Sequence, residues 1–92
     1  MIRSFRHKRL EAFWRTGSAS GIAASHAAKL RRILGALDVA ERPEDLNFPS
    51  FQLHPLKGEL KGHWAISVNG NWRVIFRFAG ADVELVDSLD YH

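Results

Sequence analysis

Residues 64–78 read WAISVNGNWRVIFRF, and this stretch decides the fold. Large apolar side chains alternate with small or polar ones on both sides of Asn69-Gly70-Asn71, a turn sequence that tolerates positive φ. The same alternation assigns Arg73, Ile75 and Arg77 to one face and the largest apolar side chains to the other. We therefore predict a β-hairpin with one face that packs against helices and one partly cationic face.

Shorter strands are predicted on either side of this hairpin. Residues 51–55 alternate apolar and polar side chains, with His54 on the polar side. Residues 57–62 form a loop before the hairpin. After the hairpin, a turn at Ala79-Gly80 leads into a last strand at residues 83–86, which carries the chain toward residues 90–92. The second half of the sequence thus predicts an antiparallel meander.

The first half of the sequence predicts a short strand at residues 2–5 followed by two helices. Leu10, Phe13 and Trp14 have the i, i+3, i+4 spacing of a first helix, which Gly17 ends. A second helix runs to about residue 40, and its apolar stripe consists of Ala23, Ala27, Leu30, Leu34 and Leu37.

Smaller features complete the predicted architecture. Ser18 or Ser20 caps the second helix, and Pro43 begins a single helical turn. No repeat or linker divides the chain. We therefore expect one domain over residues 1–92, an α+β fold in two layers, with an N-terminal strand and two helices packed on a mainly antiparallel sheet.

Composition and charge narrow the class of protein. The 92 residues contain no cysteine and no apolar run of the roughly 20 residues that a bilayer requires, and the N-terminus lacks the apolar core of a secretory signal. We expect a cytoplasmic protein that does not associate with membranes. The net charge of +3 is unevenly distributed, because residues 1–33 carry eight Lys or Arg and one Glu. A polyanionic partner fits this block, although a solvated helix surface fits it equally well.

The most reactive group of residues lies at the end of the chain. Asp90, Tyr91 and His92 close the sequence, and Arg73 precedes them on a predicted strand. A carboxylate, a phenol, an imidazole and a fixed cation are suited to cutting a phosphodiester without a metal ion. Each of these residues also has an ordinary structural interpretation: a terminal histidine often frays, and Arg73 can stack on Trp72.

Five segments, in order, resemble the HigB family of bacterial toxins, within the wider RelE and ParE superfamily: residues 1–5 (MIRSF), 53–58 (LHPLKG), 62–64 (GHW), 68–73 (VNGNWR) and 90–92 (DYH). The resemblance implies a RelE-like fold. It also implies a ribosome-dependent endoribonuclease that cleaves mRNA in the A site of the 30S subunit, and a cognate helix-turn-helix antitoxin. DNA is contacted only through the antitoxin, and no cofactor is implied.

Carried over by position, the family's active-site residues fall on His54, Lys57, Arg73, Asp90, Tyr91 and His92. The two histidines have reference pKa values near 6.5, so either one can serve as the general acid or the general base. Arg73 and Lys57 would stabilise the negative charge of the phosphorane. Asp90 would orient an imidazole or act as the base, and Tyr91 would stack on a nucleobase or donate a hydrogen bond. His54 alone would more often be an incidental surface imidazole. Family members usually have Tyr at the position of Ser88, which alters a neighbouring aromatic contact.

Further cations are candidates for contacting RNA backbone: Lys61, Arg77, Lys8 and Arg9. Those in the first helix, together with Arg31 and Arg32, suit either ribosomal RNA phosphates or acidic residues of an antitoxin. His7, His26 and His63 lack metal-ligand spacing, so we interpret them as structural or solvated and expect no metal site. The three tryptophans are assigned mainly to the core.

Two other functions remain open from the sequence. A ParE-like inhibitor of DNA gyrase would share the fold but would need no such group of histidine, arginine and tyrosine. A catalytically inactive subunit that only binds an antitoxin would not arrest growth when expressed alone.

Overall fold

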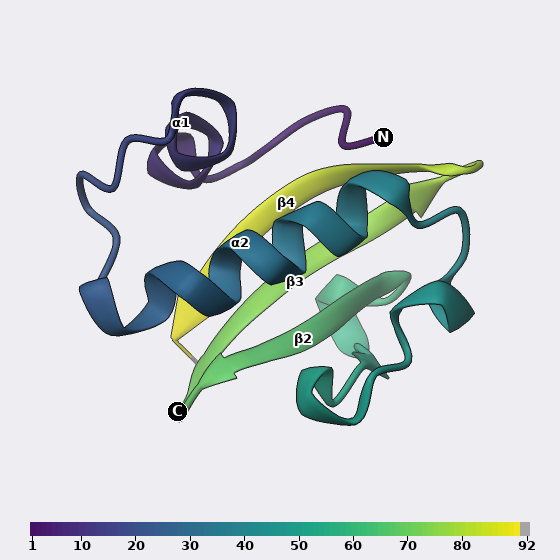
Figure 1. The fold of residues 1–92 in the computed structure, drawn as a ribbon. Helices are drawn as coiled ribbons and strands as arrows, with labels where there is room; N and C mark the ends of the chain where they lie inside the picture. The colour runs from purple at the N-terminus through teal and green to yellow at the C-terminus, as the bar shows by residue number, and fades with distance from the viewer. Residues whose placement is uncertain (91–92) are drawn as a thin grey trace.

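The computed structural model describes residues 1–90. In chain order its elements are α1 Lys8–Thr16, α2 Ala24–Val39, the 3-10 turns η1 Pro43–Leu46 and η2 Pro49–Phe51, β1 His54–Pro55, the 3-10 turn η3 Gly58–Leu60, β2 His63–Asn69, β3 Trp72–Ala79 and β4 Asp82–Asp90. Within these residues the strands form one antiparallel sheet in the order β1-β2-β3-β4. Figure 1 shows α2 lying along one face of the sheet, with α1 on the β4 side. The predicted two-layer α+β fold is confirmed.

The central hairpin forms as predicted. Trp64 pairs with Phe76 and Ile66 with Val74, and the Asn69–Trp72 pair closes the turn. Gly70, the first residue inside that turn, has φ of +55°, a conformation that glycine adopts without a steric penalty. One extra residue, Val68, enlarges β2 just before the turn, and its side chain is still buried in the core.

The two faces of the sheet differ as the alternation predicts. The helix-facing side chains join the two helices in one core, which includes Leu10, Phe13, Leu30, Ile33, Leu34, Leu37, Ile66, Val68, Val74, Phe76, Val83 and Val86. Burying each large apolar side chain contributes roughly 1.5–3 kcal/mol. The opposite face carries Arg73, Ile75 and Arg77, but Ile75 is only 1 % exposed. On that face the two arginines therefore lie on either side of a buried isoleucine.

The N-terminal segment differs from the predicted strand at residues 2–5. It runs parallel to β4 but forms only two isolated bridges, Ile2 with Val83 and Phe5 with Val86. The interruption has a local cause, because β4 contains an extra residue, Leu85, with φ of +57°. The Leu85 amide donates to the Ser4 side-chain oxygen at 2.9 Å instead of to a backbone carbonyl. The bulge lets Val83 and Val86, three residues apart, both face the core.

The first helix ends at Gly17, as predicted, with φ of +79°. The predicted cap of the second helix is wrong. Ala23 precedes α2 and provides no side-chain cap, because the helix begins too far along the chain for Ser18 or Ser20 to reach its free amides. Ser20 instead accepts a hydrogen bond from Arg9 at 3.1 Å.

The predicted strand at residues 51–55 is shorter than expected, and only His54 and Pro55 pair with β2. Gln52 causes this, since its φ of +50° and ψ of +45° break the extended backbone between η2 and β1. The single helical turn at Pro43 forms as predicted. Over residues 1–90, none of the helices combines the length and apolarity needed to cross a bilayer.

Replacing Ser4 with alanine tests the bulge in β4. The Leu85 amide is partly buried and would lose its acceptor, so we expect Ser4→Ala to lower the free energy of unfolding by about 1–3 kcal/mol. Urea denaturation measures the change. The control is Ser50→Ala at an exposed position, with an expected effect below about 0.5 kcal/mol. Equal stability of Ser4→Ala and Ser50→Ala would contradict the role of this hydroxyl.

Asp82 gives the fold a pH-dependent contribution. The Arg3 guanidinium at 2.7 Å, and then the N-terminal amine at 3.3 Å, hold the pKa of this carboxyl below its ordinary value of 3.8. A lowered pKa in the folded state stabilises the protein above that ordinary value, and the stabilisation is lost as pH falls through the lowered pKa. Asp82→Asn should therefore lower the melting temperature at about pH 7 and make little difference at about pH 2. A pH-independent difference in melting temperature would refute this.

Candidate active site

The sheet register brings two of the predicted site residues to the face that points away from the helices. His54 on β1 pairs with Ala65, and Arg73 on β3 pairs with Ser67, two residues further along β2. Paired residues and their i+2 neighbours share a face, so His54 and Arg73 lie on the same side. Their strands are separated by β2, which corresponds to roughly 10 Å between strand axes. A ligand that contacts both side chains must therefore span the width of β2.

His54 is held by a backbone contact. Its ring Nδ1 lies 2.9 Å from the carbonyl oxygen of Gln52. A carbonyl oxygen can only accept, so Nδ1 carries the hydrogen in this contact. In the half-buried ring, Nε2 is then the nitrogen without a hydrogen.

Arg73 is tied to the hairpin turn. Its Nη1 donates to the carbonyl oxygens of Gly70 at 2.7 Å and Trp72 at 3.0 Å. Its Nε is buried and has no hydrogen-bond partner within residues 1–90. These contacts hold Arg73 through carbonyl groups of the turn, not through stacking on Trp72. The cation is thus held beside the turn that joins β2 and β3.

Asp90 ends β4 beside this cation. Asp90 pairs with Trp72, and Leu89 pairs with Arg73. Asp90 is therefore one register position from Arg73, although strand alternation assigns it to the face that carries Trp72. The two residues are therefore neighbours in register at the end of the sheet, but alternation assigns them to opposite faces. Tyr91 and His92, which the sequence placed in the same site, lie outside the described residues.

The other predicted cations fall into two groups. Lys57 and Lys61 flank η3, next to β1, and both are exposed at the His54 side of the sheet. Arg77 lies on the same face as Arg73, but its Nη2 pairs with Glu84 at 2.8 Å, which offsets its charge.

Lys8 and Arg9 belong to α1, in the layer on the other side of the sheet. The structure therefore does not bring them together with His54 and Arg73. The two interpretations of the basic first helix, contact with ribosomal RNA and contact with an antitoxin, do not require it to lie near His54 and Arg73.

Comparison with known proteins decides the family. Residues 3–92 match the family described as the RelE-like toxin of the type II toxin-antitoxin system HigB. This chain belongs to the HigB-like toxin family. It is 39 % identical over 92 residues to a protein named Endoribonuclease HigB from Proteus vulgaris, and the match covers the full length of both chains.

Solved structures show that the HigB-like chain shares its fold with other toxins. A YoeB-YefM complex from Staphylococcus aureus aligns over 100 % of this chain and 98 % of that chain, with a TM-score of 0.65 and 15 % identity. A YoeB/ParE toxin from Agrobacterium tumefaciens aligns over 99 % and 96 %, with a TM-score of 0.60 and 18 % identity. At these identities the likeness concerns the fold alone.

His7, His26 and His63 of this HigB-like toxin have roles in packing or helix capping, or are buried. His7 caps α1, because its Nδ1 accepts from the Leu10 amide at 3.1 Å. His26 packs edge-on against Trp72, with ring centroids 5.8 Å apart. His63 is buried, and neither ring nitrogen has a partner in the described part of the chain. Within residues 1–90, no group of three or more His, Cys, Asp and Glu is arranged to hold a metal ion.

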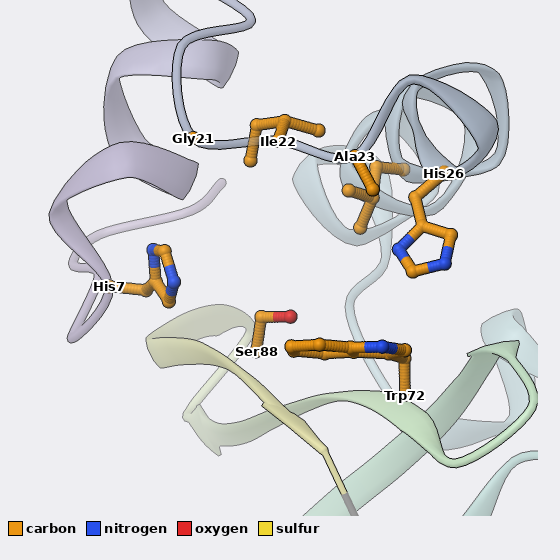
Figure 2. A pocket seen from close by; sticks show the side chains of 8 residues that line it. His7, Gly21, Ile22, Ala23, His26, Trp72 and Ser88 are labelled. Carbon is orange, nitrogen blue, oxygen red and sulfur yellow. The ribbon is translucent and has the colours of Figure 1, made fainter.

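The structure also contains an open pocket beside Ser88 that the sequence did not predict. The pocket has a volume of about 150 Å³ and is lined by His7, Gly21, Ile22, Ala23, His26, Leu30, Trp72 and Ser88. Figure 2 shows the Ser88 hydroxyl next to the edge of the Trp72 ring, with His26 on the other side of the pocket. Trp72, which we assigned mainly to the core, is 39 % exposed here. The pocket lies on the helix side of the strand ends that carry Arg73 and Asp90.

Proposed function

We propose that this chain is a ribosome-dependent endoribonuclease toxin, which arrests growth by cutting translated mRNA through metal-independent acid–base chemistry. One observation carries the proposal: the hairpin register sets His54 and Arg73 on one face of the sheet, with Asp90 one register position away. The name of the Proteus vulgaris relative supports RNA as the substrate. The family supports a toxin with a cognate antitoxin.

The reaction uses the RNA's own 2′-hydroxyl as the nucleophile. A base takes the 2′-hydroxyl proton, the 2′-oxygen bonds to phosphorus, and the 5′-oxygen leaves with a proton from an acid. The products are a 2′,3′-cyclic phosphate and a 5′-hydroxyl. His54, through Nε2, takes one of the two proton-transfer roles, and His92 takes the other. Asp90, which alternation assigns to the opposite face, has the role of orienting an imidazole. Tyr91 supplies a stacking surface or a hydrogen bond.

The cations stabilise the charge that develops during this reaction. The guanidinium of Arg73 is fixed before substrate arrives, so it meets the phosphorane without reorganising. Lys57 and Lys61 are exposed beside His54 and attract the phosphates on either side of the cut. Arg77 adds less, because Glu84 offsets its charge.

The partners follow from the same proposal. The ribosome presents mRNA in its A site, and ribosomal RNA or an acidic antitoxin surface meets the basic α1 residues Lys8 and Arg9. A helix-turn-helix antitoxin neutralises the toxin and connects it to DNA. The place of action is the cytoplasm, where translation occurs.

Substitution of the site residues tests the proposal. His54→Ala, Arg73→Ala and His92→Ala should each lower mRNA cleavage by about 10²-fold or more, because each removes a proton-transfer group or the fixed cation. Primer extension after induction measures cleavage, and circular dichroism verifies folding. The matched control is Arg42→Ala, an exposed arginine whose guanidinium pairs with Glu44 and Asp45, with unchanged cleavage.

Full cleavage and toxicity in all three site variants would overturn the proposed site. Intact messages accompanied by DNA breaks would instead indicate a gyrase inhibitor. Absence of growth arrest by the wild-type chain expressed alone would indicate an inactive antitoxin-binding subunit.

A further inference from the structure

We propose that Gln52 and Ser67 are positioning residues that hold the His54 imidazole in its reactive tautomer, an inference that rests on the proposed function of His54. Neither residue belongs to the set that the sequence assigned to the site. Both act through His54 and neither needs to touch the RNA.

The first contact fixes which ring nitrogen carries the hydrogen. The Gln52 carbonyl oxygen accepts from His54 Nδ1 at 2.9 Å. A neutral imidazole with its hydrogen on Nδ1 has its lone pair on Nε2. The ring therefore presents a proton acceptor at Nε2, and its protonated form presents a donor at the same atom. Either role of His54 in the cleavage uses this nitrogen.

The second contact holds the carbonyl in place. Gln52 adopts φ of +50° and ψ of +45°, a left-handed conformation that glutamine rarely occupies unless the surrounding structure enforces it. Its side-chain Oε1 accepts from the Ser67 hydroxyl at 2.8 Å, across 15 residues of sequence. Ser67 lies within β2 and is only 8 % exposed. A rigid strand thus anchors the residue whose backbone orients His54.

The same anchor relates His54 to the cation. Ser67 is the register partner of Arg73, so the position on β2 that anchors the imidazole through Gln52 also lies directly opposite the Arg73 backbone. Without the hydroxyl, Gln52 is free to return to an ordinary backbone conformation and its carbonyl turns away from Nδ1. The ring then redistributes its hydrogen between both nitrogens, and the fraction with a free Nε2 falls.

Three variants test this positioning. Ser67→Ala and Gln52→Leu each remove the side-chain hydrogen bond, whereas Ser67→Thr keeps the hydroxyl and serves as the matched control. The ¹⁵N chemical shifts of the His54 ring, measured in the free protein, report the tautomer directly. We expect the Nδ1–H form in the wild type and Ser67→Thr, and a mixture of tautomers in Ser67→Ala and Gln52→Leu.

Cleavage kinetics on programmed ribosomes provide the second readout. The rate constant should fall about 3- to 10-fold in Ser67→Ala and Gln52→Leu with KM unchanged, well short of the loss in His54→Ala. Ser67→Thr should restore the rate.

Two results would overturn the proposal, and they are distinguishable. If the His54 ring keeps the Nδ1–H form in both Ser67→Ala and Gln52→Leu, the positioning role fails while the proposed function stands. If His54→Ala cleaves at the wild-type rate, the proposed function of His54 fails, whatever the ring shifts show.

Discussion

The pairing of β2 with β3 across the turn at Gly70 is the constraint on which the structure depends. It buries Ile66, Val74 and Phe76 against the helices, and the same alternation must then send Arg73 to the opposite face. A slip of one residue would put the cation into the core and expose the core side chains. Fold stability and the placement of the candidate site therefore share one cause, since the register that buries the apolar residues also aligns the polar ones.

This shared cause explains how much the sequence predicts. The alternation and the turn residues are local, so the hairpin, its two faces and the helix that ends at Gly17 follow from the pattern alone. The residues alone single out Arg73 and Asp90, and the family resemblance adds His54. The register sets His54 and Arg73 on one face, with Asp90 one register position from Arg73. The approach of Asp90 to Arg73 along the sheet follows from the order of the strands alone. A short turn at Gly80 joins β3 to β4, so the end of β4 returns to the start of β3.

The features that the sequence did not predict depend on contacts between distant segments. Leu85 and Gln52 both have positive φ, and each is held by a serine that is 81 or 15 residues away. Leucine and glutamine have no preference for the left-handed region, so the sequence around them does not predict positive φ. The bulge in β4 and the short length of β1 could therefore not be predicted from the sequence. The exposed side of Trp72 likewise borders a pocket that it shares with Ser88, on another strand. Of these departures, the one at Gln52 lies two residues from His54, whose ring its carbonyl contacts.

The central claim is that one phosphodiester of mRNA lies between His54 and Arg73 on the face of the sheet away from the helices. The most direct measurement is an electron cryo-microscopy structure of this toxin on a ribosome carrying mRNA whose reactive 2′-hydroxyl is methylated. The account predicts His54 Nε2 within about 3 Å of the 2′-oxygen or the 5′-oxygen, and the Arg73 guanidinium within about 3 Å of a nonbridging oxygen. A complex in which the mRNA meets α1 at Lys8 and Arg9, with His54 and Arg73 remote from every phosphate, would contradict it.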